Sequence, residues 1–164
     1  ISELLASNRS GIRDEDDDSS DWIELHNQGD TAVGLGGWAL SDDERDLAKW
    51  VLPDVSIEAG GYLLVFASGK DRRDPRAELH TNFSLSADGE ELYLSSAESP
   101  RTVIYRYESV PPQRPDHSYG VGAAGQLGYF FEPSPGEENP DAQLRVSFVE
   151  DPRFNFERAS TMRA

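Results

Sequence analysis

The sequence contains no cysteine, almost no helix-period pattern and no long apolar run. Without cysteine it can form no disulfide, present no thiolate nucleophile and build no cysteine-ligated zinc site. No apolar segment approaches the roughly 20 residues that a membrane-spanning helix requires, so we predict no transmembrane segment. An initiator methionine is also lacking, since the first residue is Ile1 and the only methionine is Met162. We therefore expect the sequence to be a piece of a longer protein.

Positive charge is scarce. Lysine and arginine together number 15 against 31 acidic residues, which gives a net charge of −16. Proteins that bind nucleic acids neutralise phosphates with basic side chains, and anionic membranes attract the same residues. Nucleic acid is therefore not an expected partner, whereas cations are.

What the sequence does contain is a series of short alternating segments separated by turn residues. Ile23 and Leu25 share one face of the first clear strand, and Glu24 and His26 share the other. The run 62–67 is apolar on both faces, which predicts a central strand. Ala87-Asp88-Gly89 predicts a hairpin turn between 83–85 and 91–94. Strand-like segments spaced by roughly 8–12 residues predict an all-β, antiparallel sandwich or barrel; the others expected are 1–6, 33–35, 38–40, 49–53, 103–107 and 119–121.

The order of several short motifs is the most informative pattern in the chain. These motifs are DWIELHN from Asp21, LGGW from Leu35, LP from Leu52, AGGY from Ala59, FASG from Phe66, HTNFSLS from His80, SYG from Ser118 and PSPG from Pro133, followed by Asn139. Over residues 1–139 this order resembles the lamin-tail domain, a small immunoglobulin-like antiparallel β-sandwich. Nuclear lamins use this domain for contacts with proteins and DNA. Its bacterial relatives resemble accessory modules of large secreted or surface proteins.

The resemblance implies a non-catalytic module and not an enzyme. It implies protein interaction or attachment, with a protein or cell-envelope component as partner, in a bacterial extracellular or cell-surface protein. The acidic charge argues against carrying over the DNA contact. Residues 140–164 lie beyond the resemblance. We predict there a linker or an added strand, or the start of a following domain, because Pro140 and Pro152 are typical of linkers.

The segment Asp14–Asp21 carries six acidic residues in eight positions. Calcium prefers six to eight oxygen ligands, and alternating aspartates can wrap around it. The pattern is not an EF-hand, because Ser19 stands at the glycine position and Leu25 at the twelfth. A solvated acidic loop is the alternative, and a second acidic run at 41–46 would support a cation site if the fold brought the two together. The predicted calcium ligands are Asp14, Asp16, Asp18, Asp21 and Glu24.

Three consecutive aromatic residues, Tyr129, Phe130 and Phe131, cannot all point inward from one strand. We predict that they bind a partner, with burial in the sandwich core as the alternative. Combined with the acidic loop, they also allow a second hypothesis, a calcium-dependent carbohydrate-binding module with a glycan partner. No base–nucleophile or zinc-ligand spacing appears, which leaves an enzyme using clustered carboxylates as the weakest hypothesis.

Overall fold

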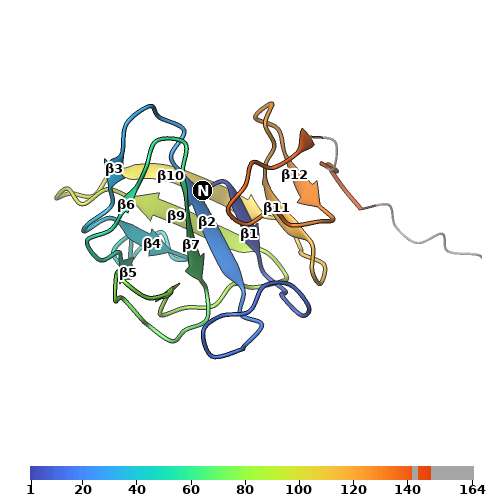
Figure 1. Cartoon of the computed structure of the whole chain (residues 1–164), viewed down its shortest axis with the longest axis horizontal. Coiled ribbons are helices and arrows are strands. Elements are labelled where there is room, and N and C mark those ends of the chain that lie inside the picture. The colour runs from blue at the N-terminus through green and yellow to red at the C-terminus, as the bar shows by residue number, and fades with distance from the viewer. Residues whose placement is uncertain (142–143, 149–164) are drawn as a thin grey trace, which may run out of the picture.

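The computed structural model describes residues 1–141 and 144–148, and these form twelve β-strands in three sheets (Figure 1). The six-stranded sheet has the order β12 (Leu127–Phe130), β11 (Ser118–Val121), β1 (Glu3–Leu5), β2 (Trp22–His26), β7 (Tyr62–Phe66) and β8 (Leu79–His80). The four-stranded sheet has the order β10 (Val103–Val110), β9 (Glu90–Ser95), β4 (Ala39–Ser41) and β5 (Trp50–Val51). A ribbon of β3 (Val33–Gly34) and β6 (Ser56–Ile57) completes the fold. The all-β class predicted from the sequence is confirmed.

The predicted central strand is β7, which lies between β2 and β8. It pairs antiparallel with β2 along its whole length, from Trp22 opposite Phe66 to His26 opposite Tyr62. Its pairing with β8 is parallel, which departs from the antiparallel expectation. A parallel partner requires a crossover connection, and residues 67–78 provide it. The loop that contains Lys70 and Arg72 belongs to this crossover.

The main core lies between the two large sheets. Ile23 and Leu25 bury their side chains there from β2, as the alternation predicted, and Leu92 does so from β9. Trp50 is fully buried, whereas Trp38 packs against the core from a partly buried position. The preceding Gly37 has φ +82°, a left-handed conformation that favours glycine.

The predicted hairpin around Ala87-Asp88-Gly89 is wrong. Strand β9 does begin at Glu90, but it pairs with β4 and β10 and not with residues 83–85. Ser84 instead forms an isolated bridge with Ser68, and the Ala87 carbonyl accepts a hydrogen bond from the Gln113 N–H. The local turn signal was present, but pairing within the second sheet determines the partner of β9. Strands β6, β8 and β12 were not predicted.

After β12 the chain folds back beside β1 and β2, where it appears orange in Figure 1. We call residues 133–139 the strap. Its Ser134 N–H lies 3.3 Å from both carboxylate oxygens of Glu3, and its Gly136 N–H donates to Glu24 at 2.5 Å. The Asn139 amide donates to the carbonyls of Ser2, at 3.2 Å, and Val121, at 3.0 Å. The strap therefore ties the end of the predicted 1–139 domain to its first strand.

Residues 144–148 lie against β12. Tyr129 and Arg145 exchange two backbone hydrogen bonds, of 2.7 and 2.9 Å, and form an isolated bridge. The predicted added strand is thus seen as one bridge, and residues 149–164 lie outside the described residues. Within the described part of the chain, no helix has the length and apolar character needed to cross a membrane.

Candidate functional site

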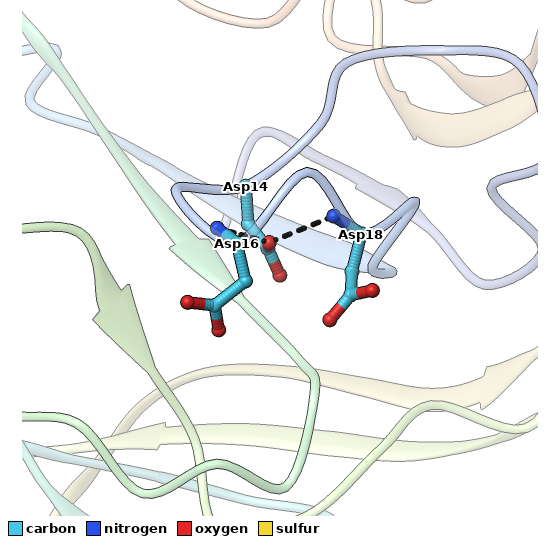
Figure 2. Close-up of side chains that lie close together, drawn as sticks. All are labelled: Asp14, Asp16 and Asp18. Carbon is cyan, nitrogen blue, oxygen red and sulfur yellow. Dashed lines mark hydrogen bonds between the residues drawn. The ribbon is translucent and has the colours of Figure 1, made fainter.

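The acidic loop between β1 and β2 is organised around Asp14. One Asp14 carboxylate oxygen accepts the backbone N–H groups of Asp16, at 3.0 Å, and Asp18, at 3.1 Å (Figure 2). The Ser20 hydroxyl donates to the other oxygen at 2.6 Å. Asp17 takes up a left-handed φ of 65°, which tightens the loop. Carboxylate oxygens of Asp14, Asp16 and Asp18 consequently lie within 4.8 Å of one another.

Lys70 provides the cation that this cluster needs. Its Nζ lies 2.7 Å from Asp14 Oδ2, 2.8 Å from Asp16 Oδ2 and 2.9 Å from Asp18 Oδ2. Arg72 adds a second positive charge and contacts Glu15 and Asp16 at 2.6 Å each. A chain-borne ammonium group therefore sits among the three aspartates that were predicted to bind calcium.

The pKa values follow from this arrangement. Burial acts to raise the pKa of Asp14, but hydrogen bonds from Lys70, Ser20 and the loop backbone outweigh it and hold that pKa well below its usual range. Hydrogen bonds from Arg72 and then Lys70 lower the pKa of Asp16. Burial acts to lower the pKa of Lys70, yet the three aspartates raise it overall. Asp14, Asp16 and Lys70 are therefore charged near neutral pH.

His80 lies beneath the loop and is fully buried. Its Nδ1 is 2.8 Å from the Ser68 hydroxyl, and its Nε2 lacks a hydrogen-bond partner and lies 3.9 Å from Glu15 Oε1. Burial lowers the pKa of His80; the Asp14 carboxylate opposes this shift, whereas Lys70 and Arg72 reinforce it. His80 is thus neutral at pH 7 and packs as a ring against Phe66.

The remaining two predicted ligands lie outside this cluster. Asp21 accepts the backbone N–H of Asn8 at 2.9 Å, and burial raises the pKa of Asp21. Glu24 is fully buried under the strap, where it accepts from Gly136 and from the Ser2 hydroxyl. The second acidic run does not join the cluster either, and its Asp42 pairs with Lys49. The structure thus brings together three of the five predicted ligands.

Lys70 and Arg72 are the site residues that sequence reasoning missed. A signal was present, because they belong to a short basic stretch in an otherwise acidic chain. An acidic run that must fold back on itself requires such counter-charges nearby. What the sequence did not reveal was that the crossover from β7 to β8 carries this stretch to the acidic loop.

The three consecutive aromatic residues divide between the interior and the surface. Tyr129 and Phe130 are buried, whereas Phe131 is 48% exposed. The Phe131 ring is held by His117, with centroids 4.9 Å apart, and by Phe148, stacked at 6.0 Å. The Arg145 guanidinium lies 5.8 Å from its centroid. We call these four side chains the Phe131 patch; of the three aromatics predicted to bind a partner, Phe131 is the one that the fold leaves accessible.

Comparison with known proteins gives one match. The family model described as Lamin Tail Domain matches residues 1–109. The matched region includes the acidic loop, Lys70 and all strands up to most of β10, and it ends before the strap and the Phe131 patch. No curated protein and no solved structure shows a significant match.

Proposed function

Because the chain belongs to the lamin tail domain family of immunoglobulin-like interaction modules, we propose that it is a non-catalytic module of a larger secreted or cell-surface bacterial protein. In this role it binds a protein or cell-envelope component and attaches its parent protein to it. The family assignment supports an interaction function. The net charge of −16 supports a protein partner over a nucleic acid or an anionic membrane.

The observation that carries this proposal is the Phe131 patch. An exposed aromatic ring held in place by neighbouring rings loses little side-chain entropy on binding and buries a large area. Phe131 has this arrangement, with His117 at its edge and Phe148 stacked beside it. Such a preordered ring is a typical anchor of a protein interface.

The test is capture of cross-linked partners from the native cell envelope with the full chain and its variants. The matched control is Val103→Ala, since Val103 is also an exposed apolar residue but lies on β10. We expect one partner to be enriched by the wild type and by Val103→Ala, and to bind Phe131→Ala about 30-fold more weakly. Equal capture by Phe131→Ala, or no saturable partner, would refute the proposal.

The second candidate is the calcium-dependent carbohydrate-binding module. The closeness of the carboxylates of Asp14, Asp16 and Asp18 favours it, whereas the Lys70 ammonium among them opposes it. A glycan array with and without chelator separates the two candidates. Chelator-sensitive glycan binding would support the second, and a blank array would remove it.

A further inference from the structure

A groove of about 650 Å³ opens at one end of the sandwich, between the two large sheets. Its lining comes from distant parts of the chain, including the first residues, the end of β2, residues 33–38, the start of β7, the end of β9, the start of β10, residues 121–127 and the end of the strap. Core residues such as Leu25 and Leu94 reach its lining. The groove is thus a continuation of the apolar core to the surface.

The walls of the groove are largely aromatic and apolar. His26 and Tyr62 stack with their ring centroids 4.2 Å apart and their planes at 12°. Trp38 lines the groove from its partly buried position. Ile104 and Leu127 also line it, and they are 49% and 44% exposed, which is unusual for large apolar side chains. Exposed apolar residues that gather around a concave surface are typical of a binding site.

A β-bulge places Ile104 among these lining residues. Val103 pairs with Ser95 and Tyr105 pairs with the adjacent Leu94, so Ile104 is the extra residue on the edge strand β10. A bulge disrupts the pairing pattern and re-aims a side chain. A second irregularity follows between Tyr107 and Val110. Strand addition along β10 is therefore disfavoured, and the groove offers pockets for side chains instead.

The charge around the groove has one sign. Glu137 and Glu138 of the strap are exposed and line it, and no lysine or arginine is among the described residues that do so. Neither carboxylate forms a salt bridge with another described residue. Unpaired carboxylates beside aromatic faces favour a cationic side chain over a neutral or anionic one.

We propose that this groove binds an extended segment of another protein in which arginine or lysine alternates with apolar residues. The apolar side chains fill the space lined by Trp38, Ile104 and Leu127. The basic side chains meet Glu137 and Glu138. The inference rests on the proposed role as an interaction module and names a recognition site separate from the Phe131 patch.

The probe is a short fluorescein-labelled peptide of alternating valine and arginine, with a counterpart in which glutamate replaces arginine. Binding is followed by fluorescence polarisation and by NMR of the ¹⁵N-labelled full chain. We expect the arginine peptide to shift the Trp38 indole and the Tyr62 and Ile104 amide resonances. Glu137→Gln/Glu138→Gln should weaken its affinity about tenfold.

The matched control is Glu44→Gln/Asp88→Asn, which removes the same charge from exposed residues outside the groove lining. Its affinity should stay within about twofold of the wild type, because the remote carboxylates are screened by salt. Equal weakening by both double variants, or equal binding of the glutamate peptide, would overturn the proposal by showing that the binding is nonspecific. The proposal would also be overturned if sedimentation detected a dimer that the peptide cannot dissociate.

Phe131→Ala separates this proposal from the proposed function. It should bind the arginine peptide as tightly as the wild type does, because Phe131 does not line the groove. If the envelope partner requires Phe131 but the peptide does not bind the groove, the interaction function stands and this proposal is refuted.

Discussion

Replacing Lys70 with methionine removes the cation from the acidic cluster while keeping most of the side-chain volume. Lys70 contacts Asp14, Asp16 and Asp18 at 2.7–2.9 Å, and no single water molecule can replace all three contacts. The Asp14 side chain is completely buried, whereas that of Lys70 is 21% exposed. The variant therefore leaves a buried carboxylate without its main counter-charge.

The expected cost lies between two limits. Breaking a fully buried ion pair costs about 3–5 kcal/mol, and an exposed pair contributes about 0–1 kcal/mol. Because one partner is buried and the other partly exposed, we expect Lys70→Met to lower the free energy of unfolding by about 2 kcal/mol. For a chain of this length that corresponds to a fall in Tm of about 4–8 °C.

The assay is thermal unfolding in EDTA and in millimolar calcium at fixed ionic strength. The wild type should give the same Tm in both buffers, because calcium would have to displace Lys70. Lys70→Met should be stabilised by calcium, since the three freed carboxylates can then bind it, and a ligand that binds only the folded state raises Tm. Magnesium, which demands stricter octahedral geometry, should have less effect.

Two outcomes would refute this reasoning. If calcium raises the Tm of the wild type, Lys70 does not fill the site, and the calcium-dependent hypothesis gains support. If Lys70→Met costs nothing in EDTA, the ammonium does not hold the cluster together. Arg13→Met is the matched control: it removes a base from an exposed pair with Asp17, so its Tm should change little.

Two further predictions concern the first strand. Burial is the largest cause that raises the pKa of Glu3 from 4.5 to about 7, so this group stabilises the fold below pH 4.5 and that stability is lost as the pH rises to about 7. At pH 8 the free energy of unfolding of Glu3→Gln, measured by denaturant unfolding, should therefore exceed that of the wild type by up to about 3 kcal/mol, and near pH 4 the two should match. The same difference at both pH values would contradict this prediction. At Gly120, an added Cβ would overlap the Ser2 carbonyl and lie 2.9 Å from Glu3 Cα, whereas at Gly34 it would meet nothing within 4 Å. Gly120→Ala should lose about 1–3 kcal/mol in urea unfolding and Gly34→Ala less than about 1 kcal/mol, and equal losses would show that β1 and β11 can separate to accept the methyl group.

The sequence predicted the fold class and the strands with clear alternation. Ile23 and Leu25 point into the core as their spacing required, and the doubly apolar run became the central strand β7. Glu24 shows where this reasoning ends. A period of two assigns a residue to a face, but it does not reveal that a strap from more than a hundred positions away will cover that face.

The candidate site was predicted in part for a related reason. The spacing of Asp14, Asp16 and Asp18 reflects local chain geometry, and these three do converge. Their counter-ion depends on the crossover that carries Lys70 to them, which is a property of topology and not of local sequence. In the same way, three consecutive aromatic residues indicate that at least one must face outward. Only the arrangement of β12 shows that the exposed residue is Phe131.

The Asn139 hydrogen bonds would have a mechanical consequence in the attachment role proposed above. The Asn139 amide donates to the carbonyls of Ser2 and Val121, so Ser2 and Asn139, which are 137 residues apart in the sequence, meet at one point. Tension applied between Ser2 and Asn139 would load this small group of hydrogen bonds before it reached the ladders of β1 with β2 and β11. Stretching in optical tweezers with handles at these two positions should therefore give a short, reversible extension at low force, ahead of the larger step in which the sheets separate. The hydrogen bonds of the strap would then break and re-form under load while the sandwich remains folded.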